Sequence, residues 1–391
     1  MAIDTIPALF LSQAERFGPR IALRFKKHGL YHDLRWSEYR DMISACAAAL
    51  VQSGIEPGDR VAILAENSVE WLVADMAILS IGAADVPLHA PLSARQAHWQ
   101  LENSGAKWIF VSNQAQLDKV QQIRGELPGL AGVVAFDERP PSPPTHLPQR
   151  GEGRNGAIGW SAFLQRGRLA RAGLQGELAR RQADLQPGDL ATIIYTSGTT
   201  GNPKGVMLTQ QNLLSNAQSF AQISPLGPWS LFFNWLPFSH IYARTVDIYV
   251  TIVVGATLSL AENADTVVAN VKELRPTNLS AVPRFYEKVL TAVQDPDKAV
   301  VRKRLHDIFG DRVDFLGSGG APLPPGVAQG YHEAGLIVLQ GYGLTESSPV
   351  ISFNRKHQNK IGSVGQPIPG VEVRIGPDGE VLTRGSHVMK G

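Results

Sequence analysis

Residues 195–205 combine hydroxyl side chains, glycines and one lysine, a mixture of side chains that could hold a phosphate group. Glycines let the backbone approach a phosphate and turn its N–H groups inward. Gly198 lies within the loop, Lys204 adds a positive charge, and the preceding run 191–195 is rich in β-forming residues. The hydroxyl donors are Thr196, Ser197, Thr199 and Thr200. The segment therefore predicts a phosphate-binding loop that follows a strand.

This loop differs from the phosphate loop of common ATPases and kinases. Lys204 follows Pro203 instead of a glycine, and Gly205 stands where a serine or threonine would hold magnesium. The pattern therefore argues against a kinase. A polar surface loop without a ligand is the plain alternative for such a segment, and other motifs must decide between the two readings.

A second segment, residues 315–323, places small residues directly after an apolar run. A flat ring could approach the backbone where bulky side chains are missing. Gly-Gly-Ala-Pro is also a common turn, so the segment alone is a weak signal. The small residues are Gly319, Gly320 and Ala321.

A third segment, residues 339–346, brings an aromatic ring, a hydroxyl and a carboxylate within a few positions. The face of Tyr342 can stack on a base, with Gly343 beside it. Thr345 and Glu346 can orient hydrated magnesium at phosphates. A lone glutamate is usually solvated, so this motif too needs its companions.

The elements that must position these motifs alternate along the chain. Apolar runs predict strands, and stretches with helical periodicity separate them, which implies parallel sheets with helices on their faces. We expect helices after the Asn67-Ser68 cap and over residues 93–104. The expected strands include 60–64, 84–88, 107–111, 191–195, 256–260, 278–282, 313–316 and 336–339. The fold class is therefore α/β.

The length of the chain suggests more than one packed unit. A chain of 391 residues with 43% hydrophobic content exceeds what one core usually serves. Residues 140–156 are rich in proline, glycine and charge and read as a surface loop. We expect a first α/β subdomain over 1–165 and a second over 166–391, which carries the phosphate loop and the start of a β-rich region.

Composition limits the cellular setting and the partners. Lys+Arg 37 against Asp+Glu 35 argues against a nucleic-acid surface spread over the molecule. Cys46 is the only cysteine, so we expect a reduced, buried thiol and a cytoplasmic protein. The apolar run 248–260 is too short to span a bilayer and reads as a buried helix followed by a strand. Peripheral contact with the inner membrane surface and a homodimer are left open.

The order of these motifs resembles the acyl-adenylate-forming superfamily, which includes acyl-CoA synthetases, firefly luciferase and nonribosomal adenylation domains. The resemblance runs to residues 379–391, which are similar to the glycine-rich motif before the family's ribose-binding aspartate. Within the superfamily, three segments look most like long-chain fatty acyl-CoA synthetases: 236–244, 280–289 and 341–350.

The resemblance implies a fold and a set of roles. The fold is a large N-terminal domain with two parallel-type sheets, flanking helices and a small β-rich subdomain. Thr196 and Glu346 would hold Mg²⁺, Thr345 would face the α-phosphate, and His240 would line the acyl and pantetheine channel. The β- and γ-phosphates would contact Thr196, Ser197, Gly198, Thr199, Thr200 and Lys204. The adenine would lie among Tyr342, Gly343, Gly319, Gly320 and Ala321.

The implied reaction activates a long-chain fatty acid with ATP. The carboxylate attacks the α-phosphorus, pyrophosphate leaves, and coenzyme A then displaces AMP from the acyl adenylate. The carboxylate is already a nucleophile, so Ser197 is interpreted as a phosphate donor and not as a catalytic serine. ATP, Mg²⁺ and coenzyme A are the expected cofactor and co-substrates.

The chain departs from the family pattern because it stops before the ribose-binding aspartate, the hinge and the small C-terminal domain with its catalytic lysine. We therefore expect a fragment of a longer enzyme that is nearly inactive alone. Two alternatives stay open. One is an acyl-AMP ligase that loads a carrier protein, which the compact segment 346–365 modestly disfavours; the other is a non-catalytic module that binds a nucleotide or an acyl group.

Overall fold

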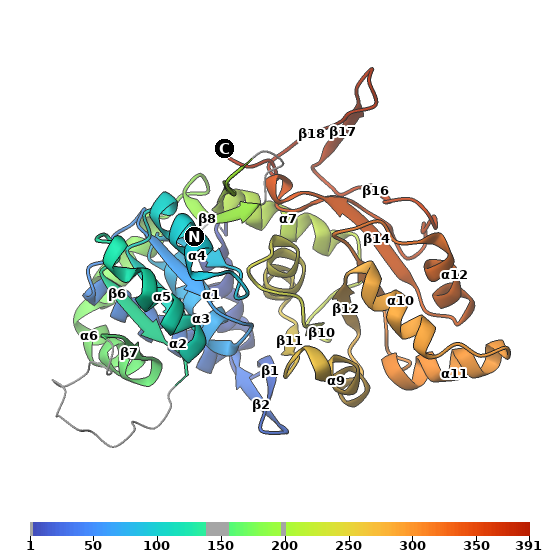
Figure 1. The fold of residues 1–391 in the computed structure, drawn as a ribbon, viewed down its shortest axis with the longest axis horizontal. Helices are drawn as coiled ribbons and strands as arrows, with labels where there is room; N and C mark the ends of the chain where they lie inside the picture. Colours follow the sequence, from blue (N-terminus) through green and yellow to red (C-terminus); the bar gives the residue numbers. More distant parts are fainter. Residues whose placement is uncertain (1–2, 138–155, 197–200) are drawn as a thin grey trace.

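The computed structural model describes residues 3–137, 156–196 and 201–391. It contains two large sheets with helices packed on their faces and a small antiparallel hairpin (Figure 1). The predicted α/β class and its arrangement of sheets are confirmed. Most of the predicted loop 140–156 and the centre of the predicted phosphate loop, 197–200, lie outside the described residues.

The first sheet has seven strands in the order β7-β6-β5-β3-β4-β8-β9. All neighbouring strands pair in parallel except β8 and β9, which form an antiparallel hairpin. The predicted strands at 60–64, 84–88, 107–111 and 191–195 all lie in this sheet. Its strands are β3 (Arg60–Leu64), β4 (Ala84–Leu88), β5 (Trp108–Val111), β6 (Gly132–Ala135), β7 (Ile158–Gly159), β8 (Leu190–Thr196) and β9 (Lys204–Thr209).

The second sheet has nine strands in the order β16-β15-β14-β13-β12-β10-β11-β1-β2. Its centre is parallel, and antiparallel strands lie at both edges. The strands are β1 (Ile21–Lys27), β2 (Leu30–Arg35), β10 (Leu231–Asn234), β11 (Thr257–Leu260), β12 (Asn278–Ala281), β13 (Phe315–Ser318), β14 (Val338–Gly343), β15 (Val350–Phe353) and β16 (Gln366–Pro367). The remaining strands, β17 (Glu372–Ile375) and β18 (Val381–Arg384), form a hairpin that projects from the body (Figure 1).

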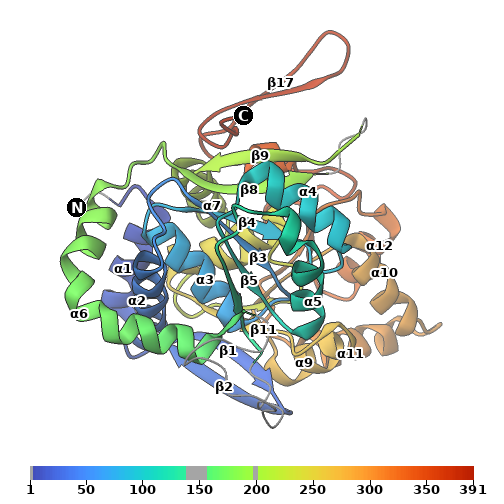
Figure 2. The same ribbon diagram turned by 60° about the vertical axis from the view of Figure 1, so that its left-hand side comes forward.

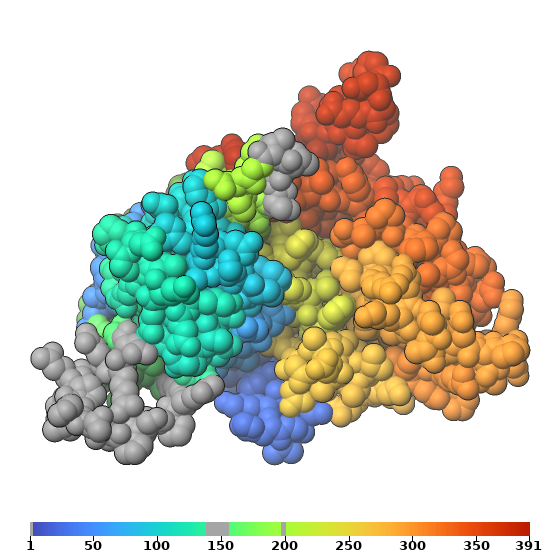
Figure 3. All heavy atoms as spheres, viewed as in Figure 1, coloured from blue at the N-terminus to red at the C-terminus, as the bar shows by residue number. Residues whose placement is uncertain are grey.

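The two sheets exchange strands across the predicted subdomain boundary. The hairpin β1–β2 comes from the first 35 residues but joins the second sheet, and the hairpin β8–β9 follows residue 166 but joins the first. The division into 1–165 and 166–391 stays a prediction about domains. Each of the two large sheets contains strands from both sides of this boundary. Figure 3 shows the face on which the blue and cyan part of the chain meets the yellow to red part.

Helices cover both faces of each sheet. In the first sheet, successive residues of a strand point to opposite faces, so Ile63 packs toward α2 and α3 while Leu64 packs toward α4 and α5. The helices of the first half are α1 (Ile6–Phe17), α2 (Trp36–Gln52), α3 (Val69–Ser80), α4 (Ala94–Ser104), α5 (Gln114–Ile123) and α6 (Trp160–Asp184). A short 3-10 turn, η1 (Arg124–Glu126), follows α5. Figure 2 shows α6 along the outer edge, next to α1 and α2.

The second sheet is covered in the same way. Phe315 faces the large core between the sheets, whereas Leu316 faces the helices on the outer side. The helices of this half are α7 (Gln210–Gln222), α8 (Val250–Val254), α9 (Val267–Leu274), α10 (Pro283–Ala292), α11 (Lys298–Phe309) and α12 (Pro325–Glu333). Short turns are η3 (Ala264–Thr266) and η4 (Thr345–Ser347).

One helical segment has a geometry that the sequence pattern does not predict. Residues Ala243–Tyr249 (η2) form a π-helix that runs directly into α8. The predicted buried helix followed by a strand at 248–260 is confirmed, since Gly255 ends α8 in a left-handed conformation before β11. Single-turn π segments often lie at functional sites, so the residues just before this one are candidates for such a site.

No helix in the described part of the chain is long and apolar enough to cross a membrane. Cys46 is buried in α2, and burial raises the pKa of its thiol, as expected for an inert cysteine. The cytoplasmic location, the homodimer and the peripheral membrane contact stay predictions.

Candidate active site

A cavity of about 320 Å³ opens at the ends of three strands. Thr196 is the last residue of β8, Gly319 directly follows β13, and Tyr342 lies near the end of β14. Ligands of open α/β sheets bind outside the carboxyl ends of the strands, because the loops there converge on one point. The cavity is lined by Thr196, His240, Ile241, Tyr242, Gly319, Gly320, Gly341, Tyr342, Gly343, Leu344, Thr345, Glu346, Pro349, Val350 and Phe353.

Most of the predicted site residues that the structure describes line this one cavity. They are Thr196, His240, Gly319, Gly320, Tyr342, Gly343, Thr345 and Glu346. Lys204 and Ala321 do not line it. Lys204 is exposed and begins β9, where it pairs with Thr196 across the hairpin. Ser197, Gly198, Thr199 and Thr200 lie outside the described residues, so their roles stay predictions.

Two glycines keep the cavity open because a side chain has no room there. A Cβ atom on Gly319 would lie 3.1 Å from Cζ of Tyr242, so the ring would have to move. A Cβ atom on Gly343 would lie 1.7 Å from the carbonyl oxygen of Pro349, which backbone geometry forbids. Close packing at the cavity wall therefore requires glycine at positions 319 and 343.

His240 is held as a neutral imidazole. Its Nδ1 accepts a hydrogen bond from the backbone N–H of Tyr242 at 3.2 Å, so the ring proton resides on Nε2. Partial desolvation of the ring at the cavity wall, with a smaller contribution from the charge of His89, lowers the pKa of His240 below its usual value. The imidazole is therefore uncharged at neutral pH and can donate one hydrogen bond from Nε2.

The end of the chain packs beside Glu346. The backbone N–H of Met389 donates to the carbonyl oxygen of Glu346 at 2.8 Å, and Met207 on β9 exchanges backbone hydrogen bonds with Lys390 and Gly391. Asn212 in α7 donates from its side chain to the carbonyl oxygens of residues 386 and 388. Sequence reasoning missed Asn212, since a polar residue inside an amphipathic helix gives no signal of its own.

A buried ion cluster behind the cavity was also missed. Arg244 donates to Asp75 Oδ1 at 2.6 Å, to Asp85 Oδ1 at 3.2 Å and to Thr192 Oγ1 at 2.8 Å. It also donates to the hydroxyl of Tyr249, and both aspartates are fully buried. We call these five residues the Arg244 cluster. Burial raises the pKa of Asp75, while the nearby guanidinium opposes that rise.

The Arg244 cluster joins the two halves of the cavity wall. Thr192 lies four residues before Thr196 on β8, and Arg244 lies four residues after His240 at the start of the π-helix. A guanidinium with several fixed donors can hold these segments in one geometry. The cluster therefore supports the cavity from behind without lining it.

Comparison with known proteins places this arrangement in a family. Residues 10–391 match the family described as AMP-binding enzyme. The chain belongs to this family. The resemblance to acyl-adenylate-forming enzymes that the motifs predicted is thereby confirmed.

The similar curated proteins are longer than this chain. A long-chain-fatty-acid–CoA ligase of Mycobacterium bovis is 30% identical over 404 residues, covering 93% of this chain and 64% of that ligase. Another from Xenopus laevis is 27% identical over 439 residues, covering 99% of this chain and 58% of the ligase. The chain thus spans less than two thirds of the length of these relatives.

Solved structures support the fold independently. The inhibitor-bound N-terminal domain of FACL13 from Mycobacterium tuberculosis matches with a TM-score of 0.80 and 24% identity, covering 99% of this chain and 90% of that one. ATP-bound MatB from Rhodopseudomonas palustris matches with a TM-score of 0.80 and 24% identity, covering 99% and 71% of the two chains. At these identities the likeness shows the fold alone.

Proposed function

We propose that this chain forms the nucleotide- and acyl-binding part of an ATP-dependent long-chain fatty acid–CoA ligase. The proposal rests mainly on one observation: residues from the segments that the sequence assigns to phosphate, base and acyl binding line a single cavity. Membership of the AMP-binding family supports the adenylating chemistry. The names of the relatives support a long-chain fatty acid as the substrate and coenzyme A as the acceptor.

The oxygen donors at the cavity fit a magnesium–ATP complex. Mg²⁺ usually binds through one or two carboxylates together with substrate phosphates and water. Glu346 and Thr196 offer a carboxylate and a hydroxyl at the same cavity, and no cluster of three or more metal-binding side chains occurs in the described ranges. Bound Mg²⁺ would supply Lewis-acid neutralisation of the phosphate charge.

In the first step, a carboxylate oxygen of the fatty acid forms a bond to the α-phosphorus as the bond to the pyrophosphate oxygen breaks. Negative charge builds on the phosphate oxygens in the transition state, and preorganised donors stabilise it. Thr345 would donate to the α-phosphate, and Thr196 with Lys204 would face the outer phosphates. Tyr342, 37% exposed at the cavity mouth, would stack on the adenine.

In the second step, the thiol of coenzyme A would lose its proton to solvent and its sulfur would bond to the acyl carbon. AMP would leave with the electron pair of the broken C–O bond. His240 would line the route of the acyl group and the thiol. As a neutral imidazole it can donate from Nε2 without placing a charge beside an apolar chain. Ile241 and Phe353 offer apolar walls to that chain in the same cavity.

The test measures binding rather than turnover, because the chain spans 64% of the length of the Mycobacterium bovis relative. The probe is a hydrolysis-resistant hexadecanoyl-adenylate analogue, measured by calorimetry against the same analogue with a two-carbon acyl group. We expect the long chain to bind at least about tenfold more tightly, because burying several methylenes contributes roughly 0.8 kcal/mol each. Equal affinities would contradict the long-chain assignment.

A second comparison tests the nucleotide end of the site. Glu346→Gln should abolish the gain in ATP affinity that Mg²⁺ provides, since the carboxylate is lost while its shape is kept. Glu380→Gln, on the exposed hairpin turn, is the matched control and should leave that gain unchanged. If Mg²⁺ raised the ATP affinity of Glu346→Gln as much as that of the unchanged chain, this would contradict a role for Glu346 in holding Mg²⁺.

A further inference from the structure

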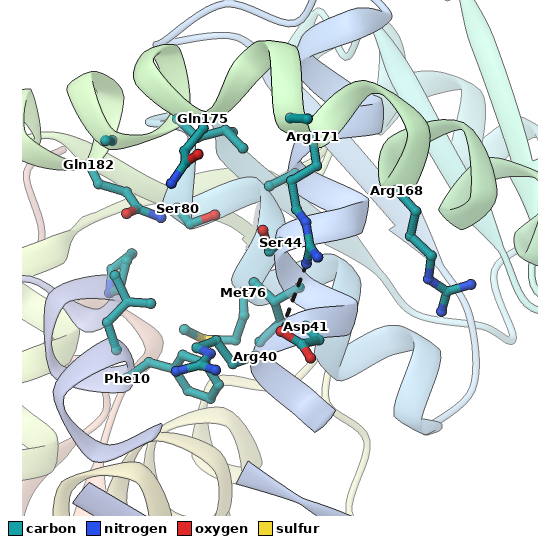
Figure 4. Close-up of a pocket in the computed structure, with 17 residues that line it drawn as sticks. Phe10, Arg40, Asp41, Ser44, Met76, Ser80, Arg168, Arg171, Gln175 and Gln182 are labelled. Carbon is teal, nitrogen blue, oxygen red and sulfur yellow. Dashed lines mark ion pairs between the residues drawn. The ribbon is translucent and has the colours of Figure 1, made fainter. Parts of the chain in front are cut away.

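A second, larger cavity of about 620 Å³ lies among α1, α2, α3 and α6. Figure 4 shows that its side chains come from all four helices, with α6 along one side. Its volume falls within the range of roughly 300–1,000 Å³ that is typical of small-molecule sites. Among the described residues, none that lines it also lines the candidate active site. It is therefore a separate site.

The packing of α6 explains why a gap remains. Near the start of the helix, a Cβ atom on Gly167 would lie 1.8 Å from the carbonyl oxygen of Ala45, so α6 touches the backbone of α2 there. At the other end, Arg181 donates to the carbonyl oxygen of Ile55 at 2.6 Å. Between these anchors the short side chains of Ala172 and Ala179 leave space unfilled. The other α6 side chains that line the cavity there are Arg168, Arg171, Gln175 and Leu178.

The cavity has an apolar floor. The side chains that form it come from four different helices and are each at most 8% exposed, so only the atoms that face the cavity are open to a ligand. Burying such surface against an apolar ligand is favourable in proportion to the area removed from water. The floor consists of Phe10, Ile43, Ala47, Met76 and Leu178.

The edge of the cavity is cationic. Arg40 on α2 and Arg168 and Arg171 on α6 line it, against the single carboxylate of Asp41. Arg171 lies 3.8 Å from Asp41, a loose pair whose side chains are both substantially exposed (Figure 4). Arg40 forms no ion pair or side-chain hydrogen bond with any residue that the structure describes. The edge therefore carries an excess of positive charge beside an apolar floor.

We propose that this cavity binds a single-chain anionic amphiphile, with a long-chain carboxylate as the ligand class. The carboxylate would accept hydrogen bonds from Arg40 and Arg171, because guanidinium groups match the geometry of a carboxylate. The hydrocarbon chain would lie on the floor between α1 and α6. The proposal goes beyond the proposed function, in which the acyl group occupies the other cavity.

The shape of the site favours this ligand over a membrane surface. A membrane contacts a convex face that presents several apolar side chains, whereas here the apolar side chains lie inside a recess between helices. The large exposed apolar residue on α6 is Leu169, and it does not line the cavity. An amphiphile that enters as a single chain therefore fits better.

The test uses hexadecanoate with a photoreactive diazirine near the end of its chain. After irradiation of the 391-residue chain, mass spectrometry identifies the labelled peptides. We expect labels in α1, α2 and α6, separate from any labels on residues 236–242 or 341–353 at the candidate active site. Unlabelled hexadecanoate should compete, and hexadecan-1-ol should compete at least about tenfold less well, because it lacks the charge that the arginines bind.

Variants test whether the arginines and the open space of the cavity cause the labelling of α1, α2 and α6. Replacing both arginines, Arg40→Ala with Arg171→Ala, should lower the labelling of α1, α2 and α6 at least about tenfold through loss of charge-assisted hydrogen bonds. Arg166→Ala, also exposed on α6 but outside the cavity, should change it less than about twofold. Ala172→Trp should block labelling by filling the space, and thermal melts confirm that each variant is folded.

Three results would overturn the proposal: unchanged labelling in the double variant, equal competition by the alcohol, or labels confined to the candidate active site. A fourth comes from vesicles of phosphatidylglycerol. If they bind the chain through Arg40 and Arg171 while free hexadecanoate labels neither α2 nor α6, the arginines serve a membrane surface and the proposal fails.

Discussion

Arginine plays opposite parts in two regions of this molecule. In the Arg244 cluster, the guanidinium is fully buried, and two fully buried aspartates, a threonine and a tyrosine surround it. At the edge of the α6 cavity, the side chain of Arg171 is 44% exposed and has, among the residues that the structure describes, only a loose carboxylate partner. The buried guanidinium holds protein segments together, whereas the exposed one stays available to a ligand.

The difference follows from desolvation. A charge taken out of water costs several kcal/mol unless close partners compensate it, so Arg244 must keep all its partners. An exposed arginine remains hydrated and adds little to stability, so evolution can use it for binding without weakening the fold. Substitutions in the two regions should therefore differ in how far they lower the free energy of unfolding.

Arg244→Met should lower the free energy of unfolding by about 3–5 kcal/mol, because it leaves Asp75 and Asp85 buried without their cation. Urea denaturation followed by circular dichroism measures the change. Adding Asp75→Asn to the same protein should restore part of the loss, since one uncompensated carboxylate disappears. A loss under about 1 kcal/mol in the single variant would show that the cluster is not a desolvated ion network.

Asp247 tests a buried carboxylate that has no cationic partner in the described part of the chain. Its Oδ2 accepts from Asn234 at 2.8 Å, and burial raises its pKa to about 7. Between its ordinary pKa and that value the folded state binds more protons than the unfolded state, so stability should fall as pH rises and level off above about pH 7. Asp247→Asn should reduce this fall by roughly 2–3 kcal/mol in denaturation at pH 5 and pH 8. If the free energy of unfolding of Asp247→Asn varied with pH in the same way as that of the unchanged chain, this would contradict the raised pKa of Asp247.

Gly167→Ala tests the contact that sets the width of the α6 cavity. The new Cβ atom would meet the carbonyl oxygen of Ala45 at 1.8 Å, so α6 must shift, at a cost of about 1–3 kcal/mol. Gly173→Ala is the matched control on the same helix, because nothing lies within 4 Å of its Cβ position. The control should stabilise the protein by about 0.5–1 kcal/mol, since alanine favours the helix. Effects of the same sign at both positions would refute the close contact.

Arg171→Ala should change the free energy of unfolding by no more than about 0.5 kcal/mol, because its pair with Asp41 is long and exposed. Arg166→Ala should have an equally small effect on the free energy of unfolding. The same urea titration used for Arg244→Met gives the comparison directly. A loss of several kcal/mol in Arg171→Ala would mean that the cavity arginines are structural, and the contrast between the two regions would disappear.

Much of the fold and of the candidate site could be predicted because the signals lie within short segments. The strands at 60–64 and 84–88 are apolar runs between turns, and Ser68 caps the helix between them. Thr196 and Glu346 belong to motifs that follow strands, and strands of parallel sheets end at one edge. These two strands belong to different sheets, so the meeting of segments 150 residues apart in one cavity depends on how the two sheets pack.

What could not be predicted depends on pairs of residues that are far apart in sequence. Asp75 and Arg244 are separated by 169 residues, and nothing near either position signals that both are buried. The exchange of the hairpins β1–β2 and β8–β9 between the sheets has the same cause, since strand order is decided by which apolar faces pack together. The α6 cavity exists only because of where helices touch.

The α/β class, the family resemblance and most of the residues that line the candidate active site thus follow from the amino-acid sequence alone. Those features rest on local chemistry: glycines that allow close approach, hydroxyls in a loop, and apolar runs with a clear period. The tertiary structure alone decided how each charged side chain is used. Whether an arginine is compensated in the interior or left free at a cavity depends on burial, and burial is a property of the packed chain.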